Sequence, residues 1–152
     1  MRLEVTRRAE LAVQAVAVLA PGGARLKAPA LAAALGTTPG FVAQVVGPLV
    51  KAGWVRSVPG PTGGYSLTEV ASDASVLDVI EAVDGPTADG HCVAQDKTCG
   101  VGAACALHDA WTQARDTLTT ALAATPAVRA AQPLEAPPRA RRTSRTTAST
   151  IA

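Results

Sequence analysis

All the cysteines of the chain lie within one short segment. Cys92, Cys99 and Cys105 are separated by six and five residues, and His108 follows Cys105 by three positions. The only other histidine, His91, stands directly before Cys92. Thiolates together with an imidazole are the ligands of a zinc ion or an iron–sulfur cluster. Packing does not readily explain such a concentration, so we expect a metal site with Cys92, Cys99, Cys105 and His108 as its ligands.

The spacing of these cysteines leaves the metal open. Structural zinc sites usually contain close pairs, because two ligands on one turn preorganise the site. Gaps of six and five residues place the ligands on an open loop, which suits a larger iron–sulfur cluster. Zinc stays a rival, and so does a site of bare thiols that senses oxidants without any metal.

The charges of the chain are divided along its length. Residues 1–56 carry seven basic residues against two acids, residues 57–135 carry three against ten, and the last seventeen carry four against none. A basic N-terminal third favours a polyanionic partner, whereas an acidic middle does not. The division predicts a nucleic-acid reader joined to a segment with another task.

Other classes of protein fit the sequence poorly. No stretch reaches the roughly 20 apolar residues that a membrane span needs, and an odd number of cysteines favours a reducing compartment over a disulfide framework. We therefore expect a cytoplasmic protein without a membrane partner. No set of base, nucleophile and orienting group stands outside the cysteine segment, so we expect neither an enzyme nor a small-molecule substrate.

The order of elements in the first half predicts a winged helix. Helices are expected over residues 6–20, 28–35 and 39–52, with a Thr38 cap and a kink or break at Pro48. Strands are expected over 54–58 and 65–68, joined by a turn rich in Pro and Gly. Three helices followed by a β-hairpin form a winged helix-turn-helix, so the fold class is mainly α with a small β-hairpin wing.

The second half predicts a cysteine loop between two helices. Ser75 and Asp78 resemble a capping box for a helix that ends at Gly85. A loop follows, and then a helix over 104–123, with Cys105 and His108 on one face and an apolar stripe suited to dimerisation. We therefore divide the chain into a DNA-binding domain at 1–70, a cluster loop and dimerisation helix at 71–125, and a disordered basic tail at 126–152.

Several of these motifs together resemble a known family. They are Met1–Leu3, the wing residues Gly60–Leu67, the helix residues Val79–Asp84, the three cysteines and the run Cys105–Trp111. Across residues 1–125 the chain resembles bacterial winged-helix regulators of the IscR/NsrR type. The resemblance implies a homodimer on a partly palindromic double-stranded DNA operator, with one cluster per subunit, [2Fe–2S] being favoured over [4Fe–4S]. It also implies a fourth ligand, which is either His108 or Glu10 from the partner subunit, and we favour His108.

The resemblance has two departures. The gap between the first two cysteines is one residue longer than the family spacing, and Gly40, Ala43 and Pro48 occupy positions that are usually polar or helix-favouring. Gln44 is then the clearest base reader, since Gln pairs bidentately with adenine.

We assign three groups of DNA-contacting residues. Thr37, Thr38, Phe41 and Gln44 are expected to face the major groove. The backbone phosphates would be held by Arg7, Arg25, Lys27, Lys51 and Arg56. The wing would approach the minor groove through Gly63, Gly64 and Tyr65.

The predicted function is a repressor that senses redox state, iron–sulfur status or nitric oxide. A metal-free thiol sensor with the same fold and an iron–sulfur carrier without DNA binding are the alternatives.

Overall fold

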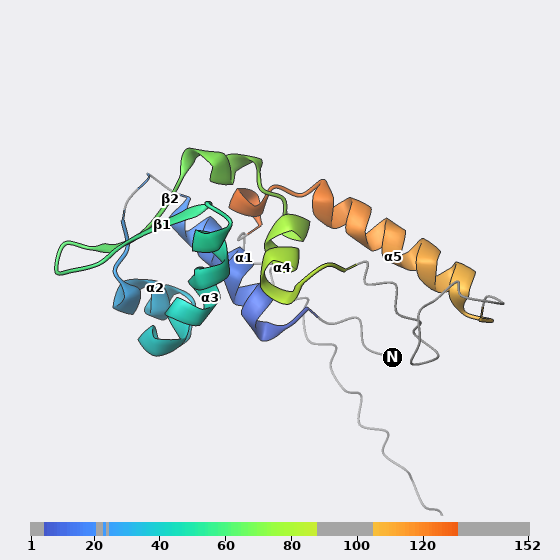
Figure 1. Cartoon of the computed structure of the whole chain (residues 1–152), viewed down its shortest axis with the longest axis horizontal. Coiled ribbons are helices and arrows are strands. Elements are labelled where there is room, and N and C mark those ends of the chain that lie inside the picture. Colours follow the sequence, from blue (N-terminus) through green and yellow to red (C-terminus); the bar gives the residue numbers. More distant parts are fainter. Residues whose placement is uncertain (1–4, 21–22, 24, 88–104, 131–152) are drawn as a thin grey trace, which may run out of the picture.

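The described part of the chain consists of a head of packed helices with a β-hairpin and of a projecting helical arm (Figure 1). The computed structural model describes residues 5–20, 23, 25–87 and 105–130. In chain order the elements are α1 (Arg7–Leu19), α2 (Ala28–Ala34), α3 (Pro39–Lys51), β1 (Val55–Val58), β2 (Gly64–Leu67), the 3₁₀ helix η2 (Glu69–Asp73), α4 (Val76–Asp84), α5 (His108–Ala123) and the 3₁₀ helix η3 (Ala127–Arg129). We call α1–α4 with the hairpin and η3 the head, and α5 the arm. The predicted mainly helical winged-helix fold with a long C-terminal helix is confirmed.

The starts of three helices are fixed by local caps, which the sequence predicts for Thr38 and Ser75. Thr6 and Thr38 cap α1 and α3, accepting hydrogen bonds from the N–H groups of Ala9 at 3.1 Å and Phe41 at 3.3 Å. At the start of α4, Ser75 and Asp78 form the expected capping box. Such caps satisfy N–H groups that no helical carbonyl can reach, and each is worth about 1 kcal/mol.

Pro48 neither divides nor ends α3, so the expected break at this position is wrong. The helix is continuous from Pro39 to Lys51. Proline removes one helical hydrogen bond, which frees the carbonyl of Gln44, and Gln44 is exposed to water. Val45 and Leu49, on either side of Pro48, are fully buried and hold the helix against the core.

Small aliphatic side chains fill the core of the head. The residues that are at most 2% exposed come from all four head helices, from β1 and from the two 3₁₀ helices, and the larger ones are Leu11, Val16, Leu19, Leu31, Val42, Val45, Val46, Leu49, Val55 and Val79. Phe41, Trp54 and Tyr65 pack against this core from its edge. Burial of each Val or Leu contributes about 1.5–3 kcal/mol, so the helices can pack closely without large aromatic residues at their centre.

A third extended segment joins the wing, which the sequence did not predict. In the hairpin, Val55 pairs with Leu67 and Ser57 with Tyr65, in antiparallel register. On its other side, Tyr65 exchanges two backbone hydrogen bonds with Leu26, at 2.8 and 2.9 Å. The segment before α2 is therefore fixed to the base of the wing.

The arm begins later than expected and is anchored at its C-terminal end. The predicted helix over 104–123 begins only at His108 in the structure. Beyond the arm, the Val76 N–H donates to the Thr125 carbonyl at 2.8 Å, and the Ala127 N–H donates to the Ala74 carbonyl at 2.9 Å. Ala127 is fully buried, so the start of the expected disordered tail is in fact part of the head. The rest of that tail, residues 131–152, lies outside the described residues.

Candidate nucleic-acid interface and cysteine segment

Helices α2 and α3 form the expected helix-turn-helix. Gly36, at φ +60°, follows the end of α2 in the left-handed conformation, and two residues later Thr38 caps α3. The two helices are inclined at 92° to each other, within the range of this motif. Among the described residues no single helix is long and apolar enough to cross a membrane, and only this bent pair together reaches that length and composition.

The outer face of α3 is narrow and carries few polar groups. Within this fully described helix, Gln44 and Lys51 are the exposed polar side chains, and Gly40, Ala43 and Gly47 form the rest of its middle. Small residues let a helix backbone come close to a ligand surface. A helix of this shape can enter a major groove deeply, with Gln44 reaching the base edges.

Three of the four predicted base-facing residues take part in the fold itself. Phe41 is half-buried and packs against the core. Thr37 is half-buried, and its N–H donates to the Ala32 carbonyl at 2.9 Å. Thr38 is exposed but serves as the helix cap. Gln44 is thus the residue of this group whose side chain is exposed and not used in folding the helix.

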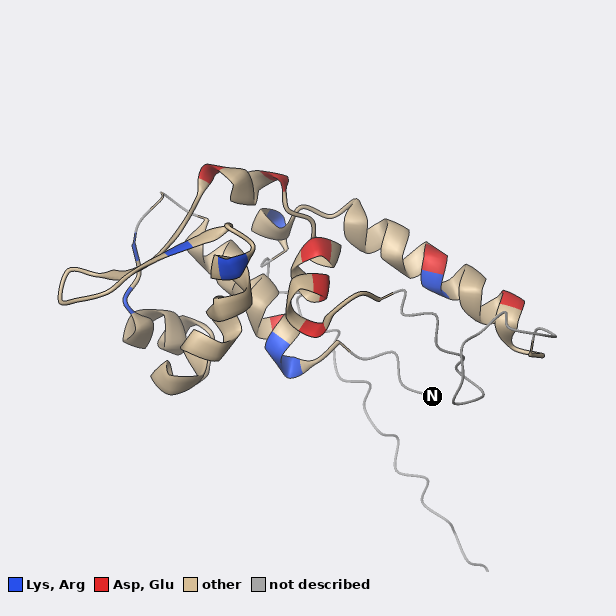
Figure 2. Ribbon diagram, viewed as in Figure 1, with Lys and Arg blue, Asp and Glu red and all other residues tan. Residues whose placement is uncertain are grey.

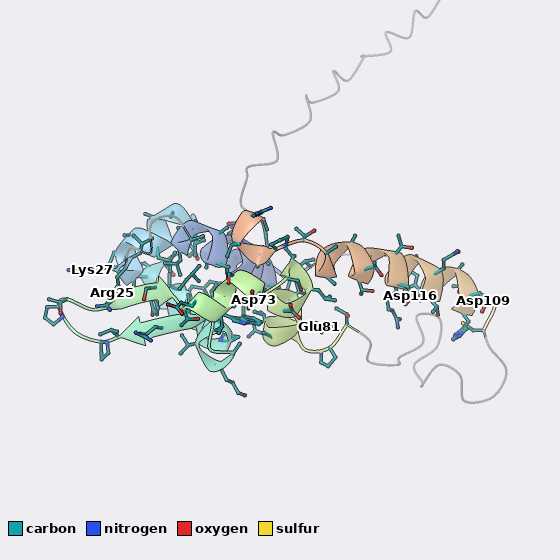
Figure 3. The ribbon with its side chains drawn as sticks, turned by 90° about the horizontal axis from the view of Figure 1, so that it is seen from above. Arg25, Lys27, Asp73, Glu81, Asp109 and Asp116 are labelled. Carbon is teal, nitrogen blue, oxygen red and sulfur yellow. The ribbon has the colours of Figure 1, made fainter. Side chains whose placement is uncertain are left out.

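Positive charge gathers at the wing end of the head. Between Glu10 and Glu69 the chain has no acidic residue, and in this interval Arg25, Lys27, Lys51 and Arg56 are all exposed. Figure 2 shows these cations on α3 and around the hairpin, with the acids over η2, α4 and α5. In Figure 3, Arg25 and Lys27 lie beside the hairpin, at the opposite end from Asp109 and Asp116. This polarity gives the head one face that attracts a polyanion and one that repels it.

Arg7 does not belong to this cationic face. Its guanidinium contacts the Glu10 carboxylate at 2.8 Å, and both side chains are exposed. The pair lies in the first turn of α1, next to the acidic end of α4 (Figure 2). The structure therefore separates Arg7 from the other four predicted phosphate-binding residues.

The glycines of the wing are required by close backbone contacts. Gly63 is buried, and a Cβ there would lie 2.1 Å from the Val58 carbonyl oxygen. Gly64 has φ +143°, and its Cβ would lie 2.5 Å from the Leu26 carbonyl oxygen. These two residues shape the wing, and Tyr65 beside them is half-buried, with part of its side chain against the core.

Cys105 and His108 lie at the far end of the arm. Both are half-buried, and the His108 N–H donates to the Cys105 carbonyl at 3.0 Å. The expectation that both share one helical face is not met, because Cys105 precedes α5 and only His108 belongs to it. They are one turn apart in the chain, and a thiol and an imidazole are ligand types of a zinc ion or an iron–sulfur cluster. Cys92 and Cys99 lie outside the described residues.

Within the part of the chain that the structure describes, no group of three or more His, Cys, Asp or Glu side chains is placed to hold a metal ion. Glu10, the alternative ligand, belongs to α1 in the head. It accepts hydrogen bonds from Arg7 at 2.8 Å and from Gln14 at 3.2 Å. In Figure 1, the first turn of α1 lies away from the tip of the arm of the same chain. Glu10 could therefore reach such a site only from another subunit.

The chain leaves α4 for the cysteine segment through a firmly held end, which the sequence did not reveal. The Thr87 hydroxyl and N–H donate to one Glu81 oxygen at 2.6 and 3.0 Å, and these hydrogen bonds hold the pKa of Glu81 below its ordinary value. Thr6 donates to both oxygens of Asp84, at 2.8 and 2.9 Å. Arg8 donates to the Val83 carbonyl and lies 3.7 Å from Asp84. The end of α4 is thereby tied to the start of α1.

Comparisons with known proteins agree with this geometry. The model of the Rrf2 family, described as iron-dependent transcriptional regulators, matches residues 5–126. An HTH-type transcriptional regulator of Mycobacterium tuberculosis is 32% identical over 122 residues, covering 79% of this chain and 76% of that protein. The HTH-type regulator IscR of Vibrio atlanticus is 41% identical over 71 residues, covering 47% of this chain and 40% of IscR.

A solved structure shares the fold. The crystal structure of CymR, the global cysteine regulator of B. subtilis, has a TM-score of 0.67 at 22% identity, and the match covers 83% of this chain and 94% of CymR. The family and these relatives consist of transcriptional regulators and not of enzymes. The chain is a member of the Rrf2 family of winged-helix transcriptional regulators.

Proposed function

We propose that the protein is a dimeric DNA-binding repressor whose affinity for its operator is controlled by an iron–sulfur cluster on the cysteine segment. The observation that carries the proposal is that the candidate DNA-binding and metal-binding residues lie at opposite ends of the molecule. An acid-free helix-turn-helix and wing occupy one end of the molecule, and a thiol and an imidazole occupy the tip of the arm at the other. The domains at 1–70 and 71–125 follow the same division.

The arm supports the dimer. Within α5, which the structure describes in full, no residue is buried, and Leu118 on its apolar stripe is 45% exposed. Only the C-terminal part of the stripe contacts the head, where Leu122 packs against the core. A second copy of the arm, packed antiparallel, would cover the remaining stripe and bring each arm tip to the head of the other subunit.

The ligand set is the one that the sequence predicts. We assign Cys92, Cys99, Cys105 and His108 to a [2Fe–2S] cluster, with Glu10 of the partner subunit as the alternative to His108. We favour His108 because it completes the run Cys105-x-x-His108, whereas Glu10 would have to give up its hydrogen bonds from Arg7 and Gln14 to bind a cluster. A cluster bound there would supply a group that gains or loses an electron, or reacts with nitric oxide. The protein's own contribution is to connect this segment to α4, and through Asp84 and Thr6 to α1.

A metal-free thiol sensor is the second candidate. Cys105 is half-buried at the arm tip, where oxidation of its thiol would alter the same turn into α5. An iron–sulfur carrier without DNA binding is the third, and the acid-free face of the head argues against it.

Anaerobic reconstitution with iron and sulfide separates these candidates. Wild-type protein should develop visible absorption bands and change its affinity for DNA, and Cys99→Ala should do neither. His108→Ala should alter the spectrum, whereas the control His91→Ala should leave it unchanged. Colourless protein that binds one zinc ion, or protein whose DNA affinity responds only to thiol oxidation, would refute the cluster.

A parallel test addresses the reading helix. Gln44→Ala should weaken binding to a duplex that the wild-type protein selects from a random-sequence pool, by about 1–3 kcal/mol, and leave the dimer intact. An unchanged affinity and footprint would show that Gln44 of α3 does not contact the DNA.

A further inference from the structure

An open groove lies between the base of the wing and the start of α2. It has a volume of about 310 Å³, and its walls come from Lys27 to Pro29 on one side and from Ser57 to Gly60 and Gly63 to Tyr65 on the other. Ser57 and Tyr65 stand opposite each other in the hairpin, so both side chains project from the same face. The bridge from Tyr65 to Leu26 then places Lys27, the next residue, beside them.

The chemistry of this groove suits an anion. Lys27 supplies a positive charge, and Ser57 and Tyr65 supply hydroxyl groups that can donate hydrogen bonds. Arg25 stands next to the groove, where its guanidinium lies 3.5 Å from the Thr62 carbonyl in the wing turn. The whole groove lies within the interval of the chain that has no acidic residue. A cation flanked by hydroxyl donors matches the oxygens of a phosphate group.

The position of the groove in the fold indicates that the phosphate belongs to the backbone of bound DNA. In a helix-turn-helix the second helix enters the major groove, and the helix before it crosses the sugar–phosphate backbone. Here α3 is the entering helix, α2 begins at the groove, and the wing stands beside it (Figure 1). The backbone strand that separates a major groove from the adjacent minor groove would therefore pass over this site.

We propose that this groove seats one phosphodiester of the DNA backbone, with Lys27 neutralising its charge and the hydroxyls of Ser57 and Tyr65 donating to its oxygens. The proposal rests on the proposed function, because it presumes that α3 reads DNA. It adds Ser57 to the interface and gives Tyr65 a role in positioning the wing. Contacts of this kind set the register of a protein on DNA without reading the sequence.

The test uses the full-length protein and a duplex that it selects from a random-sequence pool. Lys27→Gln should lower the slope of log affinity against log salt by about 0.9, the value for one lost phosphate contact. Tyr65→Phe keeps the ring and removes the hydroxyl. It should weaken binding by about 10-fold, equally for selected and random duplexes, with an unchanged salt slope. Arg115→Gln, the same charge change on the arm, is the control and should leave the slope unchanged.

A scan with single methylphosphonates, which are neutral, locates the phosphate. One position should weaken binding of the wild type and not of Lys27→Gln, because the two changes remove the same interaction. If no position shows this coupling, or if Tyr65→Phe binds as the wild type does, the phosphate seat is refuted while the proposed function stands. A wild-type protein that selects no duplex from the pool would refute both.

Discussion

The close approach of Gly64 to the segment before α2 can be tested by adding a single methyl group. In Gly64→Ala the new Cβ would lie 2.5 Å from the Leu26 carbonyl oxygen and 2.9 Å from its carbon. Both atoms are backbone, so no side-chain rotation can relieve the contact. Gly64 also has φ +143°, which residues with a Cβ rarely adopt.

The expected loss of stability has two parts. The unfavourable backbone conformation costs about 1–3 kcal/mol in any residue other than glycine. To relieve the contact, Leu26 must move away from the wing, which stretches its two hydrogen bonds to Tyr65 of 2.8 and 2.9 Å. Each such bond contributes about 0.5–1.5 kcal/mol. Gly64→Ala should therefore lower the free energy of unfolding by about 2–6 kcal/mol in total.

Gly60→Ala is the matched control. Gly60 also has a positive φ, +100°, but among the described residues nothing lies within 4 Å of its added Cβ. It should show only the conformational part of the loss, about 1–3 kcal/mol. Urea unfolding of the three proteins, followed by circular dichroism, measures the difference. If Gly64→Ala is no less stable than Gly60→Ala, the bridge between Leu26 and Tyr65 does not hold the segment as described.

Three further changes test other parts of the structure. A chain that ends at residue 130 should be as stable in urea unfolding as the full chain. One that ends at residue 125 should be less stable by about 2 kcal/mol, because it lacks buried Ala127 and its hydrogen bond to Ala74. Equal stabilities of the two shortened chains would show that residues 126–130 do not stabilise the head. Gly47→Ala adds a methyl group to the outer face of α3, with no described atom within 4 Å. It should raise the free energy of unfolding by about 0.5–1 kcal/mol, because alanine favours a helix over glycine, and it should weaken DNA binding in a filter assay. An unchanged affinity would show that this face of α3 does not contact DNA. Because hydrogen bonds from Thr87 lower the pKa of Glu81 in the folded protein, their contribution is present near neutral pH and is lost as the pH falls below the ordinary carboxyl value and through the folded one. Glu81→Gln should flatten this part of the acid dependence in unfolding measured from pH 7 to 3, and an unchanged curve would contradict the assignment.

Local signals account for most of the fold. The caps at Thr38 and Ser75 and the stop at Gly85 are decided by neighbours within a few residues, so the sequence predicts them correctly. The bridge from Leu26 to Tyr65 and the return of Ala127 to the core join segments far apart in the chain. Neither has a repeat or turn signature that a single sequence could reveal. The break expected at Pro48 does not occur, because its effect depends on whether Gln44 faces water, which only the packing decides.

The sequence predicts which residue types the candidate site contains better than it predicts what each residue does. Gln44 was found because it is the polar residue in a helix of small and apolar ones, and it is indeed exposed. Phe41 fits the same helical face by sequence, but it lies at the edge of the core and packs there. Arg7 and Arg25 look alike in the sequence, yet Arg7 pairs with Glu10 while Arg25 lies along the wing. The difference depends on which elements meet in the folded chain.

The polarity of the molecule constrains how two copies can read one operator. The arm carries Asp109 and Asp116 against one basic residue, Arg115, so in the proposed dimer we expect the arms to lie off the duplex. A helix of 16 residues is about 24 Å long. Two such arms packed antiparallel would hold the heads apart by about this length, plus the distance from each anchor at η3 to its α3. Half-sites one turn of DNA apart are separated by about 34 Å, so in such a dimer the path from each anchor to its α3 would have to supply the remaining distance of about 10 Å for both helices to read one face of the duplex.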